Sequence, residues 1–163
     1  ISSVHSGDIS FSTARAPELT TRATSKDIAE MSVFDINAIA GTFPPSADTM
    51  LVDTRLTDEK EASCRVFRIY VDVPTHYHAT CDEYLLVIAG RGLFKIGDGE
   101  WFEARVGQLI FFKKATHHAI RLLDDQPLVF LAVDTPRRDP TDIIFVNPAD
   151  GTPETFIQTK KLY

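Results

Sequence analysis

The sequence predicts an all-β domain, and two features of the chain lead to this prediction. From about residue 50, short runs of β-branched and aromatic residues follow one another, separated by turn residues such as Gly97-Asp98-Gly99 and Asp124-Asp125-Gln126-Pro127. No long segment with helical spacing of apolar residues lies between these runs. Regular short strands without intervening helices are typical of a β-sandwich or a β-barrel.

Size and composition narrow the class of protein. The 163 residues, 44% of them hydrophobic, suffice for one globular domain. A net charge of −6 argues against a nucleic acid partner, because phosphate binding requires clustered Lys and Arg. The longest apolar runs, Tyr84 to Ala89 and Leu128 to Val133, are far shorter than the ~18 residues of a membrane-spanning helix. Two cysteines do not indicate an oxidising compartment, and the first residues lack the apolar core of a signal peptide, so we expect a cytoplasmic protein without a membrane partner.

The chain is expected to divide into three parts: an N-terminal arm (1–45), a barrel (46–134) and a C-terminal part (135–163). The arm ends at the breaker Gly-Thr-Phe-Pro-Pro, residues 41–45, and its residues 24–31 have the capping pattern of a short helix. The C-terminal part is rich in proline, and we expect it to form a strand and an extended tail that packs on the barrel.

Each run of β-forming residues is expected to form one strand. The strands are predicted at residues 50–56, 62–73, 76–78, 83–89, 92–96, 100–104, 109–112, 118–122, 128–134 and 143–146. Within the arm, Phe34, Ala38 and Ile39 have the spacing of one helix face. The arm is therefore expected to be partly helical and to pack on another surface.

The stretch with the clearest chemistry is His76-Tyr77-His78, followed by Glu83. Residues i and i+2 of a strand share a face, so the two imidazoles stand side by side and can chelate one metal ion. Glu83 opens the next strand, and antiparallel pairing of the two strands would bring its carboxylate close to both rings. If Glu83 faces inward, alternation directs Leu85 and Val87 inward as well.

Residues 76–90 resemble the first sequence motif of the cupin superfamily in full. The matching residues are His76, His78, Glu83 and Gly90. A later segment is similar to the second motif of that family, in which Gly107 and His118 match. Lys113 and Ala115 stand where the family has a proline and a glycine.

The resemblance covers about residues 50–134 and implies a small antiparallel jelly-roll barrel with one metal ion at its mouth. The ligands that it implies are His76, His78, Glu83 and His118. Three imidazoles and one carboxylate, without a thiolate, suit a divalent first-row transition metal such as Fe, Mn, Ni, Cu or Zn, of which we favour Fe. Four protein ligands leave open coordination positions, as a catalytic metal requires. The resemblance also implies a homodimer.

The expected lining of the barrel indicates the class of substrate. If alternation holds, the inward residues are Leu85, Val87, Phe94, Ile96, Ile110, Phe112, Ile120, Leu122, Val129, Leu131 and Val133. No pair of arginines is expected at the mouth, so we expect a small, largely apolar or metal-chelating metabolite rather than a multiply phosphorylated one. Arg68, Tyr70 and Arg121 are candidates for orienting it.

Three functions are compatible with such a site. We favour a metal-dependent oxidoreductase, a non-haem dioxygenase. The first alternative is a non-redox isomerase, cyclase or lyase, in which Glu83, or a nearby Tyr or His, is catalytic and moves a proton. The second is a small-molecule-binding protein without turnover. Alternation directs His117 away from the site. Cys64 and Cys81 could pair or remain free thiols, and we favour a free structural thiol for Cys81.

Overall fold

The computed structural model describes residues 32–123 and 126–161, and it confirms the all-β fold. The elements are α1 (Ile36–Ala40), β1 (Leu51–Asp58), β2 (Ser63–Ile69), β3 (Val73–Tyr77), β4 (Asp82–Ala89), β5 (Arg91–Ile96), β6 (Phe102–Arg105), β7 (Leu109–Phe112), β8 (His118–Leu122), β9 (Leu128–Thr135), β10 (Ile144–Phe145), a 3-10 turn η1 (Pro148–Asp150), α2 (Pro153–Phe156) and β11 (Ile157–Lys161). The helix expected at residues 24–31 lies outside the described residues.

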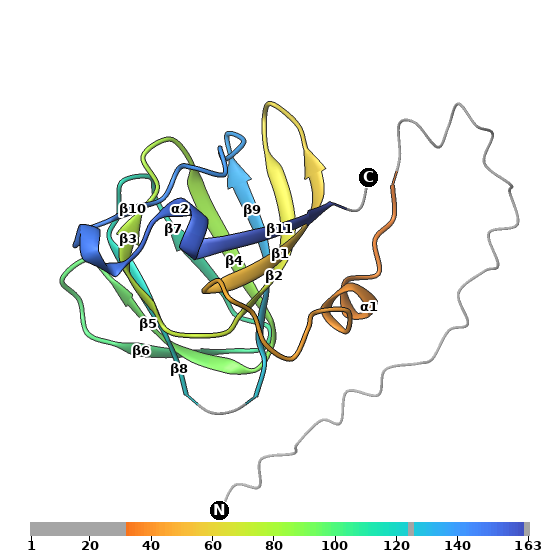
Figure 1. Cartoon of the computed structure of the whole chain (residues 1–163), viewed down its shortest axis with the longest axis horizontal. Coiled ribbons are helices and arrows are strands. Elements are labelled where there is room, and N and C mark those ends of the chain that lie inside the picture. Colours follow the sequence, from red (N-terminus) through yellow and green to blue (C-terminus); the bar gives the residue numbers. More distant parts are fainter. Residues whose placement is uncertain (1–31, 124–125, 162–163) are drawn as a thin grey trace, which may run out of the picture. The chain divides into compact units, whose positions relative to one another are not determined.

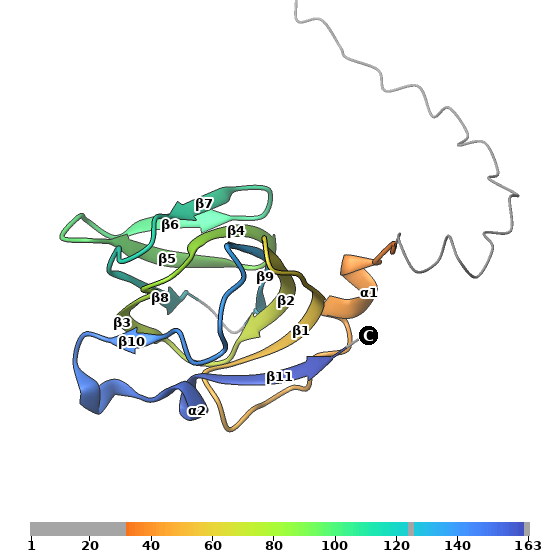
Figure 2. The same ribbon diagram turned by 90° about the horizontal axis from the view of Figure 1, so that it is seen from above.

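The strands form two sheets that face each other (Figures 1 and 2). The six-stranded sheet has the order β11-β1-β2-β9-β4-β7, and the five-stranded sheet has the order β10-β3-β8-β5-β6. Side chains of both sheets meet in one apolar core, in which Leu85 and Phe130 of the first sheet pack with Phe94 and Ile120 of the second. The space between the sheets therefore holds the residues that strand alternation directs inward.

Most predicted strands are confirmed, but the run 62–73 is two strands rather than one. β2 ends at Ile69, and β3 begins at Val73 in the other sheet. The chain crosses between the sheets at residues 70–72, where the N–H of Tyr70 donates to Met50 O at 2.9 Å and Asp72 Oδ1 accepts from Leu122 N at 2.9 Å. Tyr70 and Val71 extend the run of β-forming residues into this crossing, so the sequence pattern did not separate the two strands.

Alternation predicts the inner face correctly on β4 and incorrectly on β9. Glu83, Leu85 and Val87 are buried as expected. On β9, however, the predicted inward residues Val129, Leu131 and Val133 do not line the main core, which instead contains Leu128, Phe130 and Ala132. Val129 and Leu131 belong to a second apolar cluster on the opposite face of the strand.

That second cluster forms because the N-terminal segment covers the outer face of the six-stranded sheet. Ile36 and Ile39 of α1, together with Phe43, pack with Val66 and Val129. Because both faces of β9 are covered, both are apolar, and alternation alone cannot tell the interior from the exterior.

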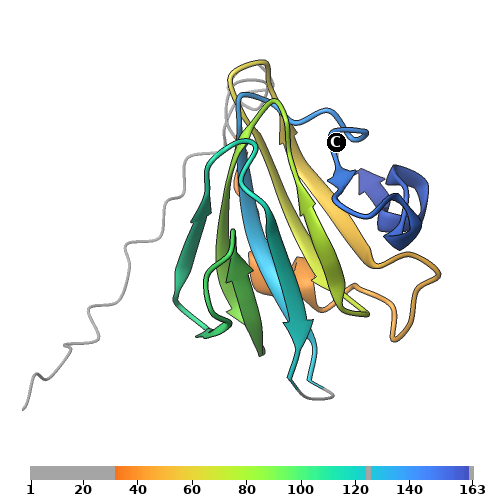
Figure 3. The same cartoon turned by 90° about the vertical axis from the view of Figure 1, so that its left-hand side faces the viewer.

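The C-terminal segment lies along one side of the barrel, as the blue ribbon of Figure 3 shows. β10 pairs antiparallel with β3, and β11 pairs parallel with β1, in the register that places Leu51 opposite Ile157. Between these strands, α2 begins at a capping box formed by Thr152 and Thr155 and buries Phe156. The last described residues thus form a strand where the sequence indicated an extended tail.

Within the described ranges, no helix has the length and hydropathy needed to cross a membrane.

Candidate metal centre

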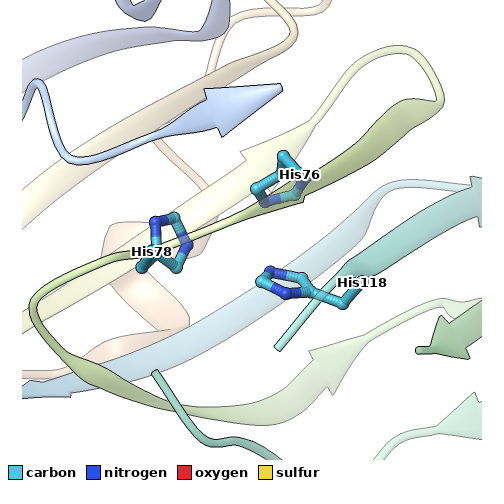
Figure 4. A group of neighbouring side chains, drawn as sticks. All are labelled: His76, His78 and His118. Carbon is cyan, nitrogen blue, oxygen red and sulfur yellow. The ribbon is translucent and has the colours of Figure 1, made fainter. Parts of the chain in front are cut away.

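Three histidines lie together between the two sheets, as Figure 4 shows. His76 on β3 is directly opposite His118 on β8 in the antiparallel register, and His78 follows the end of β3. Their ligand nitrogens all lie within 4.8 Å of one another, and the three side chains are buried. The expected chelating pair and the histidine of the second motif are therefore brought to one point.

Backbone carbonyls fix the tautomer of all three rings. The contacts are His76 Nδ1 to Pro74 O at 2.8 Å, His78 Nδ1 to Asp142 O at 2.5 Å and His118 Nδ1 to Thr116 O at 2.9 Å. A carbonyl oxygen only accepts, so each Nδ1 donates and each Nε2 keeps its lone pair. Such outer contacts orient histidine ligands at metal sites. The buried Nε2 of His118 has no hydrogen-bond partner among the described residues. This is the state expected of a nitrogen whose lone pair is kept for a metal ion.

Burial keeps the rings of His76 and His118 neutral. Burial lowers the pKa of His118 to about 4, and it lowers the pKa of His76 well below its ordinary value, aided by the neighbouring imidazoles. Both rings are therefore uncharged near pH 7, with their lone pairs available to a metal ion.

Glu83 reaches the histidines from the opposite sheet. Its Oε2 lies 3.5 Å from His78 Nε2 and 3.6 Å from His118 Nε2, and its Oε1 accepts from Arg65 Nη2 at 2.7 Å. Burial acts to raise the pKa of Glu83, but neighbouring positive charge, including the Arg65 guanidinium, holds it well below its ordinary value. The predicted pairing of the strands that carry His78 and Glu83 is wrong: β3 pairs with β8 and β10, whereas β4 pairs with β7 and β9.

Two buried arginines adjoin Glu83, contrary to the expectation that no arginine pair is directed at the site. Arg65 Nε also donates to Asp134 Oδ2 at 3.1 Å. Arg138, from the connection between β9 and β10, has its Nη1 3.3 Å from His78 Nε2 and 3.9 Å from Glu83 Oε1. Because the His78 Nε2 is an acceptor, Arg138 donates to it.

These arginines differ in how far the sequence could have revealed them. Arg65 has the same parity on β2 as the inward Phe67 and Ile69, so strict alternation from the apolar residues would have placed it inside. Arg138 lies in an irregular segment, where no periodic signal exists.

The residues that we expected to orient a substrate do not reach the site. Arg68 Nη1 and the Tyr70 hydroxyl both donate to Pro44 O, at 3.0 and 2.9 Å, on the outer side of the sheet. Arg121 lies over the ring of Trp101, 4.2 Å from its centroid. These three assignments are wrong.

A small cavity adjoins the histidines. Its polar lining comes from Arg65, His76, Glu83 and His118. Its apolar lining is Leu51, Phe67, Ile69, Val73, Leu85, Ile120 and Phe156. The free volume of this cavity is about 10 Å³, which is room for about one water molecule. A ligand in this cavity must therefore be small, or the walls must yield.

Three other residues singled out in the sequence lie outside the group of histidines. His117 is exposed, and its ring lies 5.3 Å from that of Tyr77. Cys64 and Cys81 are both free thiols, which confirms the prediction for Cys81, and burial raises the pKa of Cys81 to about 12.

The comparisons with known proteins agree with this architecture. Residues 68–134 match the family model described as the cupin domain. No curated protein matches the sequence. Among solved structures, a conserved protein of Klebsiella pneumoniae with a double-stranded β-helix domain is 15% identical, with 66% of this chain and 92% of that chain covered and a TM-score of 0.56.

Two further solved structures are similar in fold. TT1209 from Thermus thermophilus is 15% identical, with 66% of this chain and 100% of that chain covered and a TM-score of 0.57. The cupin domain of Cnp3 from Schizosaccharomyces pombe is 9% identical, with 54% and 66% covered and a TM-score of 0.50. At these identities the likeness shows the jelly-roll fold alone.

Proposed function

Because residues 68–134 form a cupin domain, we propose that the protein is an enzyme whose His76, His78, Glu83 and His118 hold one divalent transition metal. The observation that carries the proposal is the set of three buried histidines whose ligand nitrogens lie within 4.8 Å of one another, each with its tautomer fixed by a carbonyl. Iron is the metal we favour, and non-haem dioxygenase is the activity we favour. The substrate is a small metabolite that reaches the metal through the adjoining cavity.

The chain's own groups have distinct roles in this proposal. Bound Fe would supply a Lewis acid and a redox partner for dioxygen. The three imidazoles would bind the ion through Nε2, and Arg65 holds Oε1 of Glu83 so that Oε2 stays directed at His78 and His118. The apolar walls around Phe67 and Phe156 exclude bulk water from the cavity.

Glu83 supports a second candidate function, that of a non-redox isomerase, cyclase or lyase. Its carboxylate is ionised at neutral pH and lies on the cavity wall, so it can accept a proton from a bound substrate. In this case the metal would act only as a Lewis acid, and a redox-inactive ion such as Zn would sustain activity.

Metal analysis of the purified protein tests the site. We expect about one transition metal ion per chain in the wild type and its loss in His76→Ala and His118→Ala, because each change removes one ligand. His117→Ala is the matched control, since His117 is adjacent in sequence but exposed. Full metal occupancy in purified His76→Ala would contradict the assignment.

Oxygen uptake separates the candidate functions. Retained iron together with substrate-dependent oxygen consumption would support the dioxygenase. Turnover by the Zn-loaded protein without oxygen consumption would support the non-redox alternative. Stoichiometric ligand binding without turnover for any metal would favour a binding protein.

A further inference from the structure

His78 is the histidine of the group that the strand pairing of the described residues does not include. It lies one residue beyond the end of β3, whereas His76 is paired with His118 on β8 and with Phe145 on β10. A metal ligand outside a strand ladder needs other contacts to keep its geometry, because a metal site requires its ligands within fractions of an ångström of the productive position. The contacts of His78 therefore show what holds it.

Asp142, in the connection between β9 and β10, contacts both His78 and the turn that follows it. Its backbone carbonyl accepts from His78 Nδ1 at 2.5 Å. Its carboxylate accepts from the Ala79 N–H at 2.8 Å through Oδ1. Through Oδ2 it accepts from the Thr80 N–H at 3.0 Å and from the Thr80 hydroxyl at 2.5 Å. One residue thus supplies acceptors to His78 and to the two residues after it.

These bonds fix the turn relative to a distant part of the chain. Asp142 is 62 residues from Thr80 in the sequence, and it is only 7% exposed. Hydrogen bonds from N–H and O–H groups to a carboxylate are charge-assisted and stronger than neutral ones. The turn after His78 is therefore tied to the C-terminal part of the chain.

The connection between β9 and β10 holds Asp142 from both sides. Before it, the Thr141 N–H and hydroxyl donate to Asp139 Oδ1 at 2.8 and 2.7 Å, and the Asp142 N–H donates to Asp139 O at 2.9 Å. After it, Ile143 is buried in the main core, and β10 pairs with β3. Asp142 is therefore a fixed support for the turn.

We propose that Asp142 is a positioning residue for His78, which directs the Nε2 of His78 at the point shared with His76 and His118. This inference rests on the proposed function, and it adds a residue outside the cupin match at 68–134. The carbonyl keeps the proton of His78 on Nδ1, and the carboxylate fixes the turn that carries the ring. Loss of such a partner of a metal ligand typically weakens metal binding about 10–100-fold.

The variant Asp142→Ala tests the effect on metal binding, because it removes the carboxylate and keeps the backbone carbonyl. We expect the dissociation constant for Co(II), measured by competition with a chelator, to rise about 10–100-fold. The visible absorption spectrum of bound Co(II) should change as well, since a displaced imidazole alters the coordination geometry. Asp35→Ala is the matched control and should bind Co(II) like the wild type, because the Asp35 carboxylate accepts from the Ala38 N–H at the start of α1, away from the histidines.

A double-mutant cycle separates the positioning of His78 from a general structural role. If Asp142 acts through His78, Asp142→Ala should change Co(II) affinity by about twofold or less in the His78→Ala protein, which has no ring to position. The same 10–100-fold loss in both backgrounds would overturn the proposal. If Asp142→Ala does not fold, Thr80→Val replaces it in the cycle, since it removes only the hydroxyl that donates to Oδ2; it should weaken Co(II) binding about threefold or more.

The tautomer of His78 can be measured without a metal ion, by NMR of the ¹⁵N-labelled metal-free protein. We expect the proton on Nδ1 in the wild type and a mixture of both tautomers in Asp142→Ala, because the ring is then no longer held against the carbonyl. His76 and His118 serve as internal controls and should keep their protons on Nδ1 in both proteins, since other carbonyls accept from them.

The two measurements distinguish this inference from the proposed function. If the wild type binds metal and folded Asp142→Ala binds it equally well, the positioning role is overturned and the metal site remains. If the wild type takes up no metal, the metal site is overturned and the tautomer decides. A mixture of tautomers in Asp142→Ala would then support the role of Asp142, and a proton that stays on Nδ1 would overturn it.

Discussion

Ala115 adopts a left-handed backbone conformation, with φ of 62°, in the turn before His118. Its N–H donates to His78 O at 2.7 Å, so this turn links the two segments that carry the histidines. The motif that the segment resembles has a glycine at this position, where no Cβ opposes a positive φ. The chain keeps the turn geometry despite the substitution, at the cost of local strain.

Ala115→Gly is therefore expected to stabilise the protein. Relief of the left-handed strain outweighs the added flexibility of the unfolded chain, and the free energy of unfolding should rise by up to about 1 kcal/mol. Urea denaturation measures the change. Ala119→Gly on β8 is the control and should be destabilising, because a glycine weakens the interior of a strand. A loss of stability in Ala115→Gly would contradict the argument.

The buried histidines make the stability of the metal-free protein depend on pH. The pKa of His118 falls from 6.5 to about 4 on folding, so the unfolded chain binds a proton more readily than the folded one. Stability should be fully present above pH 6.5 and should fall as the pH decreases toward about 4. Glu83, whose pKa is held below its ordinary 4.5, also favours the deprotonated form in the folded protein, so its contribution to stability is lost only at lower pH.

Urea unfolding of metal-free protein at pH 7 and pH 5 checks this dependence. We expect lower stability at pH 5, and a smaller difference between the two pH values in His118→Gln, which cannot be protonated in this range. Equal stability of the wild type at both pH values would show that His118 titrates normally.

At the scale of elements, α2 contributes one buried side chain, Phe156, to the site. The Phe156 ring lies 5.5 Å from that of His76 and 6.1 Å from that of Phe145, and it lines the cavity. The short helix thus closes part of the wall beside the histidines.

Phe156→Ala is expected to destabilise the protein by about 3–5 kcal/mol, the usual cost of truncating a buried phenylalanine. Metal content should stay at the wild-type level, because Phe156 supplies no ligand. Thermal unfolding and metal analysis measure the two effects. Leu109→Ala on β7 is the control, since Leu109 is 61% exposed and should cost little. Loss of metal from a folded Phe156→Ala protein would show that α2 positions the ligands.

The elements also differ in how well the sequence predicts them. β7 and β8 have the predicted bounds, because turn residues flank them and alternation is clear. On β9 the inner face was assigned incorrectly, because α1 and Phe43 cover its outer face and make both faces apolar. Strand existence is a local property, whereas the choice of face depends on what covers each side.

At the scale of the whole molecule, the resemblance to the cupin superfamily predicts a homodimer. Sedimentation equilibrium should give twice the chain's 18.2 kDa. A mass of 18.2 kDa that does not change with protein concentration would remove this prediction.

The sequence by itself determined the all-β class, the face that Glu83 shares with Leu85 and Val87, and the side-by-side placement of His76 and His78. These follow from alternation with a period of two, which needs only neighbouring residues. Alternation did not identify His118 as a site residue. That prediction came from the resemblance of its segment to the second motif of the cupin superfamily.

The tertiary structure decided which groups meet at the histidines. Glu83 reaches them from the opposite sheet, and Arg65 and Arg138 join it from β2 and from an irregular segment. Two sheets that close on one core bring together residues that are distant along the chain. A local periodicity of side chains cannot predict which of these distant residues will meet. The charged character of the site is therefore a property of the closed barrel, which strand patterns could not reveal.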